Sequence, residues 1–110
     1  MRPGRAMGNS DRVRLDLNAP PFLKKFLALS PADLATAVKA LRKLSAMTWA
    51  EVYADHGLKW ELIETVRGQG GEKVYSFRIT RSFRALARRE GDWLRLMALF
   101  PEHDAAYGRK

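Results

Sequence analysis

Arginines occur at short intervals in the C-terminal half of the chain, and five of them are candidates to bind an anionic ligand. They are Arg78, Arg81, Arg84, Arg88 and Arg95. A guanidinium group makes forked, charge-assisted hydrogen bonds to phosphate oxygens. Arginines held close together repel one another, so a cluster without acidic neighbours usually has an anionic ligand. We therefore expect this stretch to contact phosphate groups.

Nearby carboxylates offer a different explanation of the same arginines. They could neutralise the guanidinium groups in surface ion pairs, which contribute little to binding or stability. The acidic residues in question are Glu61, Glu64, Glu90 and Asp92. The sequence leaves both interpretations open.

His103 and Tyr107 follow the arginines in the sequence, and their side chains can transfer protons. Histidine titrates near neutral pH, and a tyrosine hydroxyl can act as a general acid. Cleavage of RNA by its own 2′-hydroxyl needs a base, an acid and positive charge around the phosphorus. The chain has candidates for all three. The alternative is that His103 is a polar residue after a strand and that Tyr107 covers the edge of the core.

Three strands, over 74–79, 83–89 and 93–100, are predicted to position these residues. In each one apolar and polar side chains alternate, as in a sheet with one buried face. The predicted apolar face consists of Tyr75, Phe77, Ile79, Phe83, Ala85, Ala87, Leu94, Leu96, Ala98 and Phe100. The opposite face consists of Arg78, Arg84, Arg88, Trp93 and Arg95. Glu90-Gly91-Asp92 is typical of a tight turn, because glycine tolerates positive φ.

The rest of the chain supplies the partners of this meander. Alternation and helical spacing predict strands over 13–17 and 58–66, helices over 22–29, 31–44 and from Thr48 onward, and a glycine-rich loop over 67–72. The expected fold class is α+β. An antiparallel sheet is made of the N-terminal strand and a C-terminal four-strand meander, and two to three helices pack on one of its faces.

Length and charge indicate one basic domain. At 110 residues, 46% of them hydrophobic, the chain can bury a core of its own. We expect residues 1–11 to form a disordered basic arm and residues 12–110 to form the domain. The formal charge of +8 favours a polyanionic partner such as RNA, DNA or an acidic protein segment. A basic surface that only keeps the protein in solution is the alternative.

The composition also argues against several classes of site. Cysteine is absent, and His56 and His103 are the two histidines. Disulfides and cysteine-built metal sites are therefore excluded, a histidine-built site is improbable, and no metal or cofactor is expected. No apolar run approaches a membrane span and no signal peptide is recognisable, so we expect a cytoplasmic protein without membrane contact.

Taken together, Arg78–Ala87 (RITRSFRALA), the acidic-Gly turn, the apolar strand and the pair His103…Tyr107 resemble the RelE/ParE superfamily of bacterial type II toxins. The spacing of Arg78-Ile79 to Arg84 looks most like the YoeB branch. The order of strand, paired helices and meander is similar too, over roughly residues 13–107. The resemblance implies a RelE-like fold and a small basic toxin that a cognate antitoxin neutralises.

The resemblance also implies an activity. RelE-like members cleave messenger RNA in the ribosomal A site, so a metal-independent endoribonuclease is expected here. By position, Arg84 matches the arginine that contacts the scissile phosphate, and Arg78 matches a basic residue on the preceding strand. The expected RNA-binding residues are Arg78, Arg81, Arg88, Arg95 and Trp93.

Three further residues have acid–base roles in this interpretation. Glu61 best matches a proposed catalytic glutamate, with Glu64 as its rival. His103 and Tyr107 resemble the C-terminal His and Tyr of the RNA-cleaving branch. In YoeB these two lie together at the end of the chain, whereas three residues separate them here. Both are therefore candidates for the general acid.

Two other functions stay open. ParE-like members inhibit DNA gyrase by binding it, and a gyrase inhibitor has no need of the proton-transfer groups His103 and Tyr107. A non-catalytic relative that binds RNA or an antitoxin is the third interpretation. In the favoured interpretation the partners are a cognate antitoxin and mRNA on the ribosome.

Overall fold

A computed structural model describes residues 11–67 and 72–101 of the chain, without the side chains of residues 64–67. Five strands and three helices follow one another in the order β1 (Arg14–Asp16), α1 (Pro20–Leu27), α2 (Pro31–Ser45), α3 (Trp49–Ala54), β2 (Glu61–Arg67), β3 (Lys73–Thr80), β4 (Phe83–Glu90) and β5 (Trp93–Phe100). The predicted α+β class, with one N-terminal strand and a four-strand meander, is confirmed.

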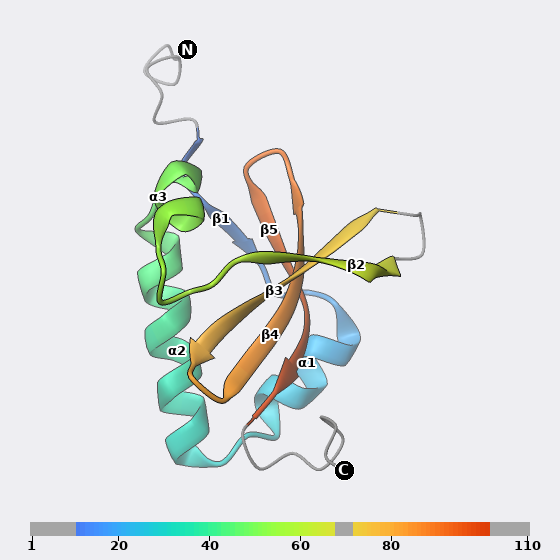
Figure 1. The fold of residues 1–110 in the computed structure, drawn as a ribbon. Helices are drawn as coiled ribbons and strands as arrows, with labels where there is room; N and C mark the ends of the chain where they lie inside the picture. The colour runs from blue at the N-terminus through green and yellow to red at the C-terminus, as the bar shows by residue number, and fades with distance from the viewer. Residues whose placement is uncertain (1–10, 68–71, 102–110) are drawn as a thin grey trace, which may run out of the picture.

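The five strands form one sheet in the order β1-β5-β4-β3-β2 (Figure 1). Neighbouring strands of the meander are antiparallel, as predicted. β1 differs, because it pairs with β5 in parallel and forms one edge of the sheet. Figure 1 shows β2, the other edge, crossing at a steep angle to β4 and β5, which reflects the twist of the sheet.

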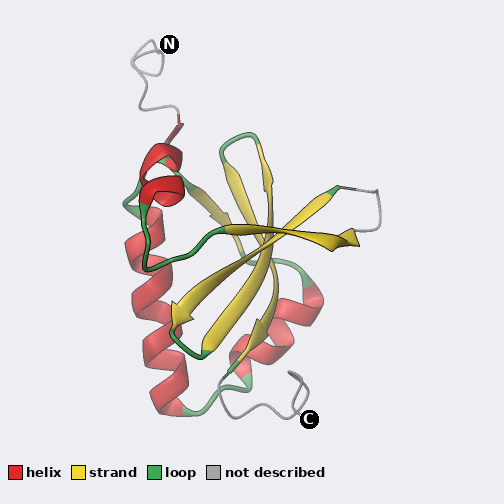
Figure 2. Cartoon of the chain, viewed as in Figure 1, coloured by secondary structure: helices red, strands yellow, loops and turns green. Residues whose placement is uncertain are grey.

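The core lies between one face of this sheet and the helices. α2 runs along the sheet in Figure 2, and α1 packs against β5. Buried side chains from both layers form one cluster, including Phe22 of α1, Leu41 and Leu44 of α2, and Phe77 and Leu94 of the sheet. The opposite face of the sheet is therefore the one without helices, and the predicted arginines lie there.

Short sequence signals fix where the helices begin. Two prolines begin α1, two residues earlier than predicted, because proline fits the first helical turn. The Ser30 side chain caps α2 by accepting a hydrogen bond from the Asp33 amide. Thr48 and Glu51 form the capping box predicted for α3.

The strand predicted to begin at Leu58 begins instead at Glu61. Lys59 adopts a φ of 50°, a left-handed conformation that cannot continue a strand. The preceding Leu58 is buried in the core, and its carbonyl accepts a hydrogen bond from the Arg78 amide. Residues 58–60 are therefore a linker that is attached to β3 rather than part of β2.

The prediction that Ala98 and Phe100 lie on the apolar face is wrong. Leu86 pairs with Ala98 but Ala87 pairs with Leu96, so β5 has an extra residue at this point, a β-bulge. The bulge reverses the alternation, because side chains on a strand have a period of two. Leu99 replaces Ala98 in the core, and Phe100 turns to the face opposite the helices.

Several predictions lie outside the described residues. These are the disordered arm, apart from Asp11, the centre of the loop between β2 and β3, and the positions of His103 and Tyr107. Within the described ranges, none of the helices is both long enough and apolar enough to cross a membrane.

Candidate functional site

The face of the sheet opposite the helices is called here the arginine face. Its rows follow from the strand register, since directly opposed residues share a face. The row at one end joins Arg78, Arg84 and Phe100, and the next joins Glu61, Ser76, Leu86 and Ala98. A later row joins Arg88, Arg95 and Asp16, and the last joins Glu90, Trp93 and Arg14. The four predicted arginines thus share this face but form two separate pairs.

Arg78 and Arg84, the first pair, are cross-strand neighbours and half-buried. Among the residues that the structure describes, neither has a carboxylate within ion-pair distance. The Nε of Arg78 is buried and has no hydrogen-bond partner there. Arg81 is exposed at the turn between β3 and β4, at the same end of the sheet. Within the described residues, two guanidinium groups without acidic partners are therefore available to bind a phosphate.

Arg88 and Arg95, the second pair, have acidic partners. Arg88 contacts Glu72 at 3.3 Å and Glu90 at 3.5 Å. Arg95 contacts Glu90 at 2.6 Å and also forms an ion pair with Asp16. Glu90 is one of the carboxylates that the sequence indicated as possible partners of the arginines, and it has this role. The roles of Glu72 and Asp16 were not predicted. The ion-pair interpretation therefore fits this pair and not the first.

Hydrogen bonds within this network shift the pKa values of Arg95 and Asp16 in the directions that favour their charged forms. The Arg95 guanidinium donates hydrogen bonds to Glu90 and to Asp16, and these bonds, with that to Glu90 first, raise its pKa. The backbone amide of Asn18 donates to Asp16 at 3.0 Å, and this bond, followed by the bond from Arg95, lowers the pKa of the Asp16 carboxyl. Both groups are therefore held in their charged forms.

Trp93 lies on the arginine face as predicted, but at the end of the face that is farther from Arg84. The residue is 37% exposed. The guanidinium carbons of Arg14 and Arg95 lie 5.1 and 5.4 Å from its centroid, within the range of cation–π interactions. Trp93 therefore does not line the Arg78–Arg84 pair.

Glu61 belongs to the row beside that pair, because it is opposite Ser76 at the start of β2. Its side chain is 54% exposed, and its contact with Lys59 is long at 3.8 Å. A carboxylate that is accessible and weakly paired can accept a proton from a ligand at this end of the sheet. Glu64 lies three residues further along β2, and its side chain is outside the described set.

The sequence did not predict three members of this face: Phe100, Asp16 and Arg14. The bulge in β5, which the sequence did not reveal, brings Phe100 beside Arg84. Asp16 and Arg14 belong to this face because β1 pairs in parallel with β5. Arg14 and Asp16 alternate with Val13, Leu15 and Leu17, and this alternation indicates that the two polar side chains lie on one face. It does not indicate which strand lies beside β1.

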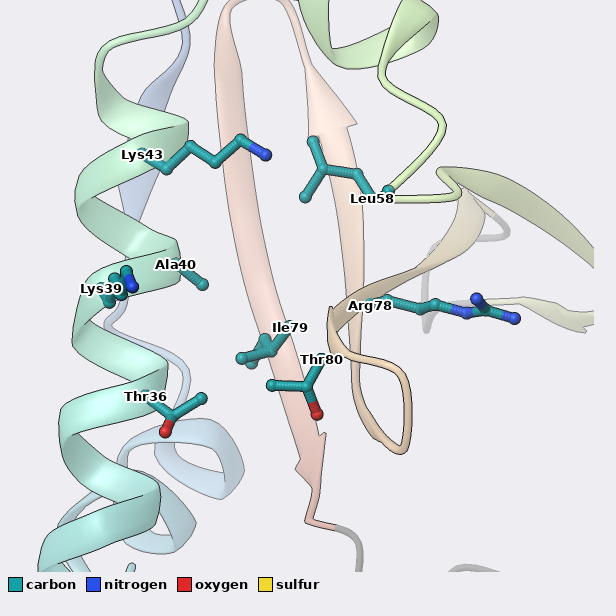
Figure 3. A pocket seen from close by; sticks show the side chains of 9 residues that line it. Thr36, Lys39, Ala40, Lys43, Leu58, Arg78, Ile79 and Thr80 are labelled. Carbon is teal, nitrogen blue, oxygen red and sulfur yellow. The ribbon is translucent and has the colours of Figure 1, made fainter.

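The structure also has a cavity of about 440 Å³ between α2 and β3, and Arg78 is one of its lining residues (Figure 3). Ile79 and Thr80 point toward α2 there, while the Arg78 side chain extends away from it. Lys43, on the helix side of the cavity, is paired with Asp55 at 3.0 Å. No group of three or more potential metal ligands occurs within the described segments.

Comparison with known proteins supports the fold. No family model matches the sequence, and no curated protein does either. Among solved structures, the chain is similar to the archaeal RelE–RelB complex from Pyrococcus horikoshii OT3, with a TM-score of 0.50 and 14% sequence identity. The match covers 86% of this chain and 97% of the other. The predicted RelE-like fold is thereby confirmed.

Proposed function

We propose that this protein is the toxin of a type II toxin–antitoxin system and an endoribonuclease that cleaves mRNA in the ribosomal A site. The observation that supports the proposal is the Arg78–Arg84 pair, which is half-buried on an open sheet face without a carboxylate partner in the described residues. The RelE-like fold and the charge of +8 agree with it.

In this proposal the two guanidinium groups bind the scissile phosphate. The 2′-oxygen of the RNA attacks the phosphorus while the bond to the 5′-oxygen breaks. Negative charge then accumulates on the non-bridging oxygens, and preorganised cations stabilise it more strongly than they stabilise the ground state. Partial burial strengthens this interaction, because it lowers the local dielectric constant.

The proton transfers are assigned to the residues around this pair. Glu61 is proposed to take the proton from the 2′-hydroxyl, with Glu64 as its rival. His103 or Tyr107 is proposed to give a proton to the leaving 5′-oxygen. Strand β5 ends beside Arg84, and His103 is two residues beyond Pro101 in the sequence. The mechanism uses no metal ion.

The partners are proposed in the same way. The solved neighbour is a complex of RelE with RelB, and we propose a protein antitoxin for this chain as well. Arg81 is proposed to contact the RNA beside the scissile phosphate. Arg88, Arg95 and Trp93 are proposed to contact the strand further along the arginine face. The cytoplasm is the compartment where translated mRNA, antitoxin and toxin would meet.

Arg84→Ala tests the function directly. Wild-type protein and the variant are induced in cells, and mRNA 5′ ends are mapped genome-wide. We expect cuts in register with codons in the wild type and a loss of about 10²–10³-fold in the variant, the effect of removing one transition-state donor. Arg42→Ala, which removes an exposed arginine from α2, is the matched control and is expected to cleave normally.

Two results would contradict the proposal. Undiminished cleavage by a folded Arg84→Ala variant would remove Arg84 from the site. Growth arrest without mRNA cuts, accompanied by a DNA damage response, would instead favour inhibition of gyrase.

A further inference from the structure

The arginine face has a second end with unneutralised charge, and it is built differently from the first. Three carboxylates of the described residues, Asp16, Glu72 and Glu90, contact Arg88 or Arg95 on this face, while Glu61, at the first end, contacts Lys59. Arg14 is exposed and has no carboxylate partner in the described part of the chain. Among the residues that the structure describes, the arginines without a carboxylate partner therefore lie at the two ends of the face, and those between them are neutralised.

An aromatic ring accompanies the free charge at this second end. Trp93 is opposite Arg14 on β1 and opposite Glu90 on β4. The ion pairs of Arg95 with Asp16 and Glu90 hold that guanidinium beside the indole. The ring is thus oriented by fixed neighbours, while Trp93 as a whole residue stays 37% exposed. An exposed indole suits an unpaired base. The Arg14 guanidinium lies over the ring, 5.1 Å from its centroid, and a stacked base would replace it there and leave Arg14 to bind the phosphate.

The distance between the two ends fits a short stretch of one RNA strand. Arg84 and Glu90 mark the two rows on β4, and at about 3.3 Å per residue the rows lie about 20 Å apart. A stacked nucleic-acid strand advances about 3.4 Å per nucleotide, and an unstacked one roughly twice as far. About three to six nucleotides would therefore connect the two ends.

We propose that Trp93 and Arg14 form a second RNA subsite, which stacks an unpaired base about three to six nucleotides from the phosphate bound by Arg78 and Arg84. The proposal rests on the proposed function, since it takes the same RNA strand as its ligand. It adds a source of affinity that is remote from the reacting atoms. Short RNA would bind at the arginine pair alone, and longer RNA would also engage Trp93.

Binding of RNA of two lengths tests the subsite. The probes are a trinucleotide and a nonanucleotide with 2′-O-methyl groups, which prevent cleavage by 2′-hydroxyl attack. We expect Trp93→Ala to weaken binding of the nonamer by about 5- to 150-fold, the loss of one base stack, and to leave trimer binding unchanged. Trp93→Phe keeps an aromatic ring and is expected to retain most of the affinity.

Arg14 is tested by the salt dependence of nonamer binding. Arg14→Ala is expected to reduce the slope of log K against log salt by about one phosphate contact. Arg42→Ala is the matched control, because Arg42 lies on α2 away from this face, and it is expected to leave the slope unchanged. Thermal melting of each variant confirms that it is folded.

The outcomes separate this inference from the proposed function. If Arg84→Ala weakens both lengths while Trp93→Ala changes neither, the second subsite is wrong and the phosphate site stands. If Trp93→Ala weakens nonamer binding while Arg84→Ala changes neither length, the stacking site stands and the proposed phosphate contact is wrong. Failure of the wild type to bind either RNA at low salt overturns both.

Discussion

At the scale of single residues, the difference between the two arginine pairs is decided by their acidic neighbours. Arg88 and Arg95 contact Glu72, Glu90 and Asp16, whereas Arg78 and Arg84 have no such partner among the residues the structure describes. The same residue type on the same face therefore serves two purposes. Arg88 and Arg95 connect neighbouring strands through ion pairs, whereas Arg78 and Arg84 have no carboxylate partner in the described segments and suit an anion.

A residue-scale prediction concerns Glu61. Glu61→Gln keeps the shape of the side chain but removes the base, so single-turnover cleavage of ribosome-bound mRNA should slow by about 10²–10⁴-fold. The fold should not change, because an exposed ion pair of 3.8 Å contributes little. Lys59→Ala breaks the same ion pair and leaves the carboxylate in place. Equal slowing in both variants would show that the ion pair, not the base, is what matters.

At the scale of elements, α3 illustrates how a helix too short to be stable alone is held in place. It has six residues, well below the length at which isolated helices persist. In addition to the capping box, a hydrogen bond holds α3 in place, because the Trp49 indole donates to the Asp92 carbonyl at 3.0 Å. Arg89 lies over the Trp49 ring at 4.2 Å, and it also donates to the Gly91 carbonyl at 2.8 Å and to the Tyr53 hydroxyl at 3.3 Å. The β4–β5 turn and α3 therefore stabilise each other.

The element-scale prediction follows from this contact. Arg89→Met keeps most of the side-chain bulk but removes two hydrogen bonds and a cation–π interaction, so the free energy of unfolding should fall by about 1–2 kcal/mol. Urea denaturation measures the change. Arg42→Met, on an exposed part of α2, serves as the control and should stay within about 0.5 kcal/mol of wild type. A shift no larger than that of the control would mean that Arg89 does not hold α3 to the turn.

At the scale of the whole molecule, two carboxylates connect distant elements. Asp16 joins β1 to β5 and β4 through Arg95 and Glu90. Asp55 joins α2 to the linker before β2, because it accepts hydrogen bonds from Lys43 and from the Leu58 amide. The pKa of each carboxyl is lowered below the ordinary value of 3.8, that of Asp16 by the amide of Asn18 and then by Arg95, and that of Asp55 by Lys43 and then by the Leu58 amide.

This predicts how stability depends on pH. A carboxyl whose folded-state pKa is lowered contributes stability that is fully present above the unfolded value and is lost as the pH falls through the folded value. The free energy of unfolding should therefore decline from about pH 4 downward, below the unfolded pKa of 3.8. Asp16→Asn and Asp55→Asn should each lower the stability at neutral pH and reduce the acid slope. Denaturation at a series of pH values tests this, and parallel curves for wild type and variants would contradict it.

The sequence by itself determined the elements and the chemistry of the arginine face. Period-two alternation identified β3, β4 and β5, and the residues Ser30, Thr48 and Glu51 marked the helix starts. These signals are local, so they can be read along the chain without knowing what lies across the sheet. They also put Arg78 and Arg84 on one face, because two neighbouring antiparallel strands with a tight turn leave little choice of register.

Only the tertiary structure decided which arginines are free and what lies beside them. The bulge that moves Phe100 to Arg84 depends on packing across β4 and β5, and neither strand's own sequence shows it. The parallel pairing that brings Asp16 to Arg95 and Arg14 to Trp93 joins segments about 80 residues apart. The reason is physical: alternation reports which way a side chain points, whereas its electrostatic partners depend on which strand lies alongside.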